Sequence, residues 1–329
     1  RHLTEDPIPP SEHDPRVPHR LERVCLRMLR KEPDQRFASA RQVLTALEAE
    51  DTEQKVVLFG REVELARLLG AHERVGHGGG GVVVVRGPRG SGRTALLRAF
   101  LERAYPSGIP TAAVSGDVED ALDKLVERLP GGTSETRSDP VGRMVARLRG
   151  RSAALVVDDV ERLPAADVEA LTELVRSRLV IEGDPLLVIL STTPQDGAAG
   201  GLCSGTSTGQ TPDVVTLEGL DRRAVVALVR EQGVEGAAGA ALGHRLHEQE
   251  GGWPGAVVEQ IEALVRAGWL ERTAEGGLRA TRDLDVLRSE PLPVPERVRV
   301  REAAHLVGLG VWERRVLDSL VVLDMAVSV

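Results

Sequence analysis

The feature that most constrains this fold is a glycine-rich turn between an apolar strand and a helix. A run of valines predicts the strand at residues 82–86, and a helical pattern begins near residue 94. Glycines in the turn allow positive φ, so that backbone N–H groups can point inward at an anion, and the helix start adds the positive end of its dipole. The turn therefore predicts a phosphate-binding loop. Its residues predicted to surround a polyphosphate are Gly87, Gly90, Ser91, Gly92 and Arg93.

One position of the loop departs from the Walker A pattern, G-x-x-x-x-G-K-[ST]. Arg93 stands where the lysine belongs, and Thr94 fills the last position. Arginine keeps the positive charge, but its group is bulkier, planar and forked. We therefore expect phosphate contact to survive the change more easily than the geometry of hydrolysis. The hydroxyl of Thr94 is predicted to bind Mg²⁺. The alternative is a glycine turn that only connects a strand to a helix.

Strands and helices alternate from residue 82 onward. Short apolar strands separated by helices predict an α/β fold with a parallel sheet covered on both faces. Helical patterns over residues 236–271 predict a helical lid after the sheet, and amphipathic patterns at 21–29 and 39–47 predict a short all-α region before it. The predicted strands are 82–86, 111–115, 153–158, 186–192 and 214–217, and the helical patterns between them are 94–104, 119–129, 139–149, 165–179 and 221–231.

A second motif is an apolar strand that ends in two carboxylates, Asp158 and Asp159. If this strand lies adjacent to the phosphate loop, it delivers Asp158 to Mg²⁺, and Asp159 is placed to polarise an attacking water. Paired acids at a strand end also serve as a helix N-cap or turn, and this alternative stays open.

The strand at 186–192 ends in the hydroxyl side chains Ser191, Thr192 and Thr193, followed by Pro194. Open α/β sheets bind ligands at this edge, so Thr192 is a candidate to sense the γ-phosphate. Turn-forming hydroxyls before a proline are an equal alternative. His244 and His247 have a spacing that can hold a metal, but with no third ligand nearby a solvated helical face is expected.

Composition narrows the class of protein. The 329 residues carry a net charge of -8, with Lys and Arg scattered among acids, so we expect no nucleic acid partner within this sequence. The two cysteines lie far apart, which argues against a disulfide framework or a zinc site. No apolar run approaches the ~20 residues of a membrane span, so no membrane contact and a cytoplasmic location are expected.

Three separated motifs together resemble the STAND signalling ATPases, relatives of the AAA+ proteins, over about residues 57–300. The first is the Phe59-Gly-Arg-Glu62 box, which is followed by the phosphate-binding loop at residues 87–94. The others are the acids at 158 and 159 and the Gly252-Trp-Pro254 segment. The resemblance implies ATP and Mg²⁺ as cofactors, with Arg61 beside the adenine and Pro254 touching the base. It also implies that Thr94 and Asp158 hold the metal. Related ATPases commonly carry an arginine where this chain has Pro194.

Residues 21–50 resemble a different family. The stretch Met28-Leu-Arg-Lys-Glu-Pro-Asp-Gln-Arg-Phe37 is similar to the closing helices of a Ser/Thr protein kinase catalytic domain. The resemblance implies a truncated kinase remnant. The glycine-rich loop, catalytic aspartate and D-F-G segment are missing here, so kinase activity is expected only of a longer parent chain. Apolar residues of the first helix have lost the lobe that covers them in kinases, so this segment is predicted to be loosely held.

These observations predict an ATP-binding regulatory switch of a Ser/Thr-kinase-linked signalling protein, with slow Mg-dependent hydrolysis. Other signalling proteins are the expected partners, with nucleotide-dependent self-association. The alternatives are a scaffold that has lost turnover and, less in keeping with the charge, DNA remodelling or loading. The predicted domains are a kinase end at 1–50, a linker at 51–57, a P-loop ATPase core at 58–235, a helical lid at 236–290, and the start of a winged-helix or repeat region at 291–329.

Overall fold

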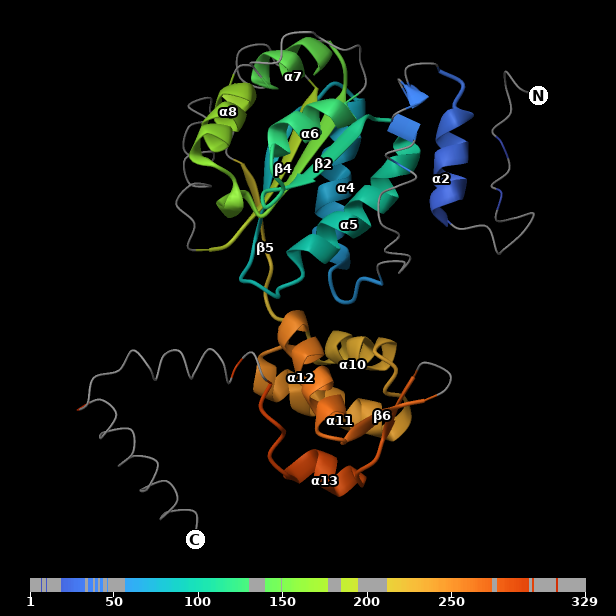
Figure 1. Ribbon diagram of the computed structural model, residues 1–329, viewed down its shortest axis with the longest axis vertical. Helices are drawn as coiled ribbons and strands as arrows, with labels where there is room; N and C mark the ends of the chain where they lie inside the picture. Colours follow the sequence, from blue (N-terminus) through green and yellow to red (C-terminus); the bar gives the residue numbers. More distant parts are fainter. Residues whose placement is uncertain are drawn as a thin grey trace. The chain divides into compact units, whose positions relative to one another are not determined.

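The computed structural model divides the chain into two compact units, Arg1–Glu218 and Gly219–Val329 (Figure 1). Apart from Val57 and Trp312, the predicted linker at 51–57, the glycine-rich loop at 197–210 and the helical stretch from 299 lie outside the described residues. The structure describes residues 7, 10, 19–32, 35–37, 39–40, 42–43, 46, 57–129, 140–148, 150–176, 185–194, 212–273, 277–295, 298 and 312.

The first unit contains a parallel sheet, as the alternating pattern predicts. Its order is β2-β3-β4-β1-β5. Every residue of β3 and β4 is buried, which explains why both strands are apolar throughout except at their carboxyl ends. The strands are β1 (Gly81–Arg86), β2 (Thr111–Ser115), β3 (Ala153–Asp158), β4 (Leu186–Thr192) and β5 (Asp213–Thr216).

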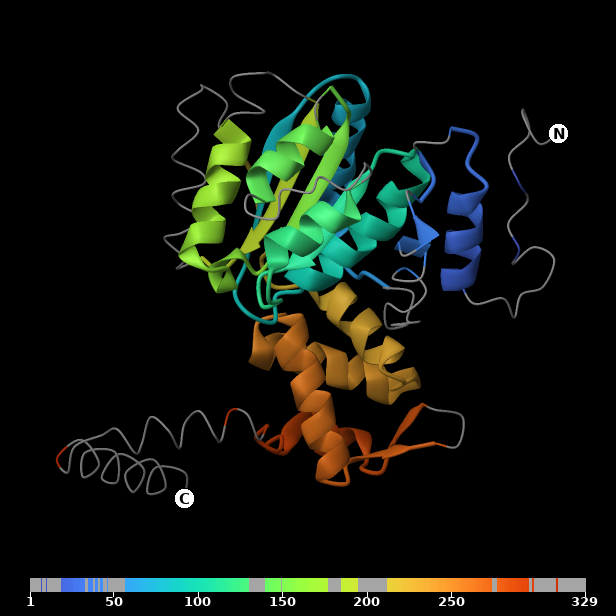
Figure 2. The ribbon, with the colours of Figure 1, turned by 45° about the horizontal axis from the view of Figure 1, so that its top comes forward.

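Helices cover both faces of this sheet (Figures 1 and 2). On one face, Leu68 and Phe100 pack with Val156 of β3, and on the other Met144 and Leu171 pack with Leu155. The side chains of successive residues of β3 thus pack into the cores on opposite faces of the sheet, because side chains alternate along a strand. The helices on the first face are α4 (Glu62–Gly76) and α5 (Arg93–Ala104), and those on the second are α6 (Ala121–Arg128), α7 (Pro140–Leu148) and α8 (Ala165–Val175).

The strand order settles whether the strand of Asp158 lies next to the strand that carries the loop. It does not, because β4 lies between β3 and β1. The hydrophobic pattern of a buried parallel strand does not specify its neighbours, because a crossover helix permits pairing with any strand. The consequence is that β4, rather than β3, supplies the residues that touch the loop backbone, and its end stands between Asp158 and β1.

The second unit consists of helices and one short hairpin. The backbone N–H of Leu220 donates to the carbonyl of Gly252 at 2.8 Å, and a Cβ on Gly219 would lie only 2.0 Å from the carbonyl oxygen of Gly251. Glycine at 219 therefore permits the close backbone crossing at the start of this unit. The elements are α10 (Arg222–Glu231), α11 (Gly236–Glu250), α12 (Pro254–Arg266), β6 (Leu270–Arg272), β7 (Leu278–Ala280) and α13 (Leu284–Ser289).

The described N-terminal residues include α2 (His19–Met28), which agrees with the amphipathic pattern there. Its Val24 is buried, whereas Leu21 and Met28 are 41% and 49% exposed. At the start of the second predicted helix, the N–H of Gln42 donates to the Ser39 hydroxyl at 3.3 Å, which is the contact of an N-terminal capping box.

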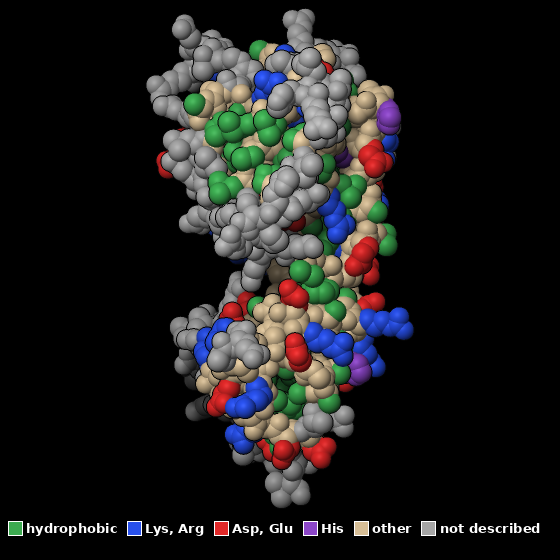
Figure 3. Space-filling view, turned by 90° about the vertical axis from the view of Figure 1, so that its right-hand side faces the viewer, with side chains coloured by type: hydrophobic (Ala, Val, Ile, Leu, Met, Phe, Trp, Pro, Cys, Tyr) green, Lys and Arg blue, Asp and Glu red, His purple; other side chains and the backbone are tan. Residues whose placement is uncertain are grey.

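Among the described residues, no helix is both long and apolar enough to cross a membrane. On the face drawn in Figure 3, acidic and basic side chains of the second unit are interspersed and do not gather by sign.

Candidate functional site

The loop that joins β1 to α5 has the backbone of an anion cradle. Gly90 and Gly92 adopt φ of 81° and 93°, a left-handed conformation that favours glycine. Gly92 is also the N-cap of α5, and no side chain caps that end of the helix. The first N–H groups of α5 therefore remain available to an anion, as the sequence predicts.

Gly87 closes the other end of this loop tightly. A Cβ at this position would lie 2.5 Å from Oγ of Ser91 and 3.1 Å from Cβ of Leu217. Ser91 is fully buried, and its hydroxyl has no hydrogen-bond partner among the described residues. The backbone N–H of Gly87 donates to the carbonyl of Thr192 at 3.1 Å, which ties the loop to the end of β4.

Thr94 and Asp158 meet, as the two motifs predict. Oγ1 of Thr94 donates to Oδ2 of Asp158 at 2.7 Å, and the hydroxyl of Ser191 donates to Oδ1 of the same carboxylate. Asp158 is 9% exposed. A hydroxyl and a carboxylate, one at the start of α5 and one at the end of β3, thus stand together beside the glycine cradle.

The hydroxyl in contact with the acids is that of Ser191, the neighbour of Thr192, which the sequence marks as a candidate to sense the γ-phosphate. The side chain of Thr192 is fully buried, and its Oγ1 donates to the carbonyl of Thr193 at 3.4 Å. A signal for Ser191 was present, because it is the first hydroxyl in an otherwise apolar strand. A role of Thr192 at the γ-phosphate stays a prediction.

Arg93 lies against acids. Its Nη2 is 2.5 Å from Oδ1 of Asp159, and Nη1 and Nη2 are each 3.1 Å from Oε1 of Glu161. Only 6% of the arginine side chain is exposed. Glu161 belongs to the short helix η3 (Val160–Arg162) and was not among the predicted site residues.

Asp159 has an unusual backbone for a non-glycine residue, with φ of 49°. Its N–H donates to Oγ of Ser191 at 2.9 Å and to Oδ1 of Asp158 at 3.1 Å, which holds this conformation. Burial raises the pKa of the Asp159 carboxyl above its usual value, and the neighbouring charge of Asp158 adds to this, while Arg93 opposes it.

Arg61 is buried and acts as a brace on the loop. Its Nη2 donates to the carbonyl of Ser91 at 3.2 Å and to the carbonyl of Glu218, and its Nη1 lies 3.1 Å from Oε1 of Glu64. Pro254 occupies the first turn of α12 in the second unit, a position suited to proline. Contacts of Arg61 with adenine and of Pro254 with the base stay predictions.

The residues present fit a magnesium-bound triphosphate. The glycine cradle and the uncapped start of α5 suit phosphate oxygens, and the unpartnered, buried Ser91 hydroxyl lies within the same loop. Mg²⁺ takes hydroxyl and carboxylate oxygens together with water and phosphate, rather than a cage built from protein alone. Thr94 and Asp158 supply such a pair. Among the described residues, no group of three or more His, Cys, Asp or Glu side chains is arranged to hold a metal ion.

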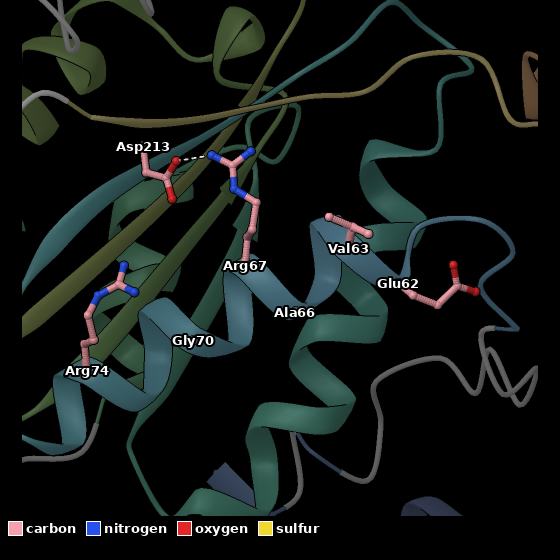
Figure 4. A pocket seen from close by; sticks show the side chains of 7 residues that line it. All are labelled: Glu62, Val63, Ala66, Arg67, Gly70, Arg74 and Asp213. Carbon is pink, nitrogen blue, oxygen red and sulfur yellow. Dashed lines mark hydrogen bonds and ion pairs between the residues drawn. The ribbon is translucent and has the colours of Figure 1, made fainter.

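A groove of about 560 Å³ lies elsewhere on the first unit, along α4 and the start of β5 (Figure 4). Arg67 of α4 crosses it to pair with Asp213 and also donates to the carbonyl of Val214 at 3.2 Å. No predicted site residue lines this groove. Its lining residues are Glu62, Val63, Ala66, Arg67, Gly70, Arg74 and Asp213.

Comparison with known proteins agrees with this geometry. Residues 57–189 match the family model described as the AAA ATPase domain. No curated protein matches the sequence.

Among solved structures, the Aeropyrum pernix ORC1 protein in complex with DNA is 16% identical, with a TM-score of 0.50, over 83% of this chain and 75% of that one. The A. pernix ORC2 protein in ADPNP–ADP complexes is 16% identical, with a TM-score of 0.49, over 70% and 67%. Cdc6p from Pyrobaculum aerophilum is 14% identical, with a TM-score of 0.48, over 63% of this chain and 62% of its own length, which is less than two thirds. The likeness to ORC1 and the strand order show the AAA+ P-loop NTPase fold.

Residues 57–189 are therefore similar to the AAA ATPase domain, and this similarity favours ATP binding.

Proposed function

We propose that the loop between β1 and α5 binds Mg–ATP, and that the bound nucleotide acts as a slowly hydrolysed switch. The observation that carries this proposal is the 2.7 Å contact between Thr94 and Asp158 at the rim of the glycine cradle. A hydroxyl at the start of the helix and a carboxylate at the end of a buried strand are the protein ligands that P-loop NTPases give to Mg²⁺.

In this proposal each predicted residue has a role. The amides of Gly90, Gly92 and Arg93 bind the β-phosphate, while Thr94 and Asp158 hold Mg²⁺. A bound Mg²⁺ would neutralise charge on the phosphate oxygens. The remaining roles rest on the family resemblance or on position, with Asp159 orienting the attacking water, Thr192 near the γ-phosphate, and Arg61 and Pro254 near the base.

Slow hydrolysis is supported by the environment of Asp159. A carboxylate that orients water needs a free oxygen aimed at that water. Here Arg93 engages Oδ1 of Asp159 at 2.5 Å, one of the two oxygens of that carboxylate, so this contact must open before both oxygens are free to orient water. We therefore propose that this chain holds nucleotide for longer than it turns it over, which suits a switch better than a motor.

As a switch, the domain would signal its nucleotide state to other proteins. To move a population from 1:99 to 99:1, ATP must favour one state by about 5.5 kcal/mol. We propose that the helical unit from residue 219 onward is the element that responds, and that signalling partners and further copies of the chain read the response. The net charge of -8 does not favour a nucleic acid partner.

Titration with a fluorescent ATP analogue tests the proposal. Wild type should bind saturably in the presence of Mg²⁺, and Thr94→Ala should weaken binding at least about tenfold, or ~1.4 kcal/mol. Thr172→Ala is the matched control, because among the described residues the Thr172 hydroxyl donates to the carbonyl of Val168 within α8. No saturable binding by wild type at millimolar analogue would favour the scaffold alternative.

A link to a Ser/Thr kinase is the finer part of the proposal, and it rests on the resemblance of residues 21–50. In this segment Arg36 donates to the backbone carbonyls of Arg30 and Lys31, at 2.8 and 3.3 Å, where a kinase would supply a glutamate. Transfer of labelled phosphate from ATP to Ser or Thr by the longer parent protein would support the link. A parent chain without a kinase lobe before residue 1 would refute it.

A further inference from the structure

The arginine at the lysine position of the loop has a contact that lysine cannot copy. A guanidinium presents two terminal nitrogens in a fixed fork, whereas an ammonium is a single point of charge. Arg93 uses this fork on two carboxylates at once, since Nη2 contacts Asp159 and both Nη atoms contact Oε1 of Glu161. The arginine is thus directed toward the segment that follows β3.

Glu161 depends strongly on this contact. Its side chain is 13% exposed, and its second oxygen, Oε2, is buried without a hydrogen-bond partner among the described residues. A carboxylate held out of water needs a charged partner, and the only ion pair the structure gives Glu161 within the described residues is with Arg93. Pairing is therefore the state that the nucleotide-free site favours.

The carboxylates around Arg93 compete with an incoming anion for its N–H groups. Asp158, Asp159 and Glu161 lie at this edge of the sheet, and the Arg93 guanidinium contacts the last two of them. An N–H group of Arg93 that donates to a carboxylate does not at the same time donate to a phosphate, because each hydrogen has one strong acceptor.

We infer that Glu161, together with Asp159, latches Arg93, so that the triphosphate of Mg–ATP must compete with these carboxylates for the same guanidinium. Glu161 is then a positioning residue that lowers the affinity of the site and holds the nucleotide-free state together. The inference rests on the proposed function, because it names the ligand that releases the latch.

Glu161→Gln tests the latch by two measurements that move in opposite directions. The variant should bind the fluorescent ATP analogue with Mg²⁺ about tenfold more tightly, a gain of ~1.4 kcal/mol. The nucleotide-free variant should unfold at a lower urea concentration, because Arg93 loses a charged partner. A residue with a merely structural role would lower stability and weaken binding together, and that result would overturn the inference.

Two further variants serve as controls for the Glu161→Gln experiment. Glu161→Asp keeps the charge and should stay within about threefold of the wild-type affinity. Glu173→Gln is the matched control, because Glu173 is exposed and its ion pair in the described part of the chain is with Arg176, the C-cap residue of the same helix. It should change neither measurement.

A second background tests the contact itself. With Arg93→Lys, the forked contact is lost, so adding Glu161→Gln should tighten binding by less than about threefold. An equal tenfold gain in both backgrounds would overturn the latch. If wild type and Glu161→Gln both fail to bind nucleotide, the proposed function fails and takes the latch with it. If wild type binds and Glu161→Gln binds no more tightly, only the latch fails.

Discussion

The hydroxyl of Ser191 donates a hydrogen bond to the carboxylate of Asp158, so β4 fixes the side chain that β3 presents at the sheet edge. The same oxygen accepts the N–H of Asp159 at 2.9 Å. Ser191 stands in register with Val85, one residue before the end of β1. Because β4 lies between β3 and β1, this one hydroxyl connects the acidic strand end to the strand that carries the loop.

Replacement of Ser191 by alanine should therefore remove the hydrogen bonds that position Asp158 and Asp159. We expect a loss of about 1–3 kcal/mol in the free energy of unfolding, because a buried N–H and a carboxylate oxygen lose their shared partner. Weaker binding of Mg–ATP should accompany this loss. Ser152→Ala is the control, since within the described part of the chain that hydroxyl donates to the carbonyl of Val75, away from the site. Urea unfolding and nucleotide titration measure the two effects, and equal behaviour of the variants would contradict the assignment.

Replacement by alanine should change the stability of the first unit in opposite directions at two of its glycines, Gly116 and Gly70. A Cβ on Gly116 would lie 2.3 Å from the carbonyl oxygen of Asp159, whereas a Cβ on Gly70 meets no atom within 4 Å. Gly116→Ala should lower stability by about 1–3 kcal/mol, because the backbone must move apart. Gly70→Ala, inside α4, should raise it by about 0.5–1 kcal/mol. Thermal unfolding of the two variants decides the matter, and a stable Gly116→Ala protein would refute the close approach.

The sequence predicted the loop and the acids because their chemistry is local. Positive φ at Gly90 and Gly92 and the position of Thr94 follow from a few adjacent residues. Asp158 could be placed at the same edge because parallel strands end together. The parallel sheet and its covering helices followed from apolar runs of strand length, and the structure confirms them.

The missed features depend on contacts between segments far apart in the chain. The partners of Arg93 follow from the positive φ of Asp159 and the turn into η3, neither of which has a signal in residue type. The position of β4 between β3 and β1 depends on which strands the crossovers join. The hairpin of β6 and β7 was missed because each strand has only three residues, too few to show alternation.

The N-terminal helix α2 should be less protected than the sheet. Val24 is its buried apolar residue, while Leu21, Met28 and the following Leu29 are each more than 40% exposed. Amide hydrogens of α2 are therefore expected to exchange faster than those of β3 and β4, whose residues are all buried. Hydrogen exchange followed by mass spectrometry measures this. Exchange in α2 as slow as in these strands would mean that the segment is firmly docked.

Acid should destabilise the first unit through His72. This residue of α4 is 2% exposed, and its ring meets the ring of Phe100 edge to face at 5.6 Å. Its Nε2 has no hydrogen-bond partner among the described residues. Burial lowers the pKa of His72 below the usual 6.5, although the nearby charge of Glu73 opposes this.

The sign of the effect follows from which state binds the proton first. Below pH 6.5 the unfolded chain takes up a proton on His72 that the folded chain refuses, so stability is lost as the pH falls from 6.5 toward the lower folded pKa. The loss from one group is at most ~1.4 kcal/mol per pH unit. Urea unfolding at several pH values between 7 and 5 gives the free energy of unfolding as a function of pH. His72→Leu should make this dependence shallower, whereas replacement of the exposed His77 by Gln should leave its slope as in wild type. A slope that persists in His72→Leu would assign the acid sensitivity to other groups, since leucine is apolar like the surroundings of Phe100 and removes the imidazole that binds the proton.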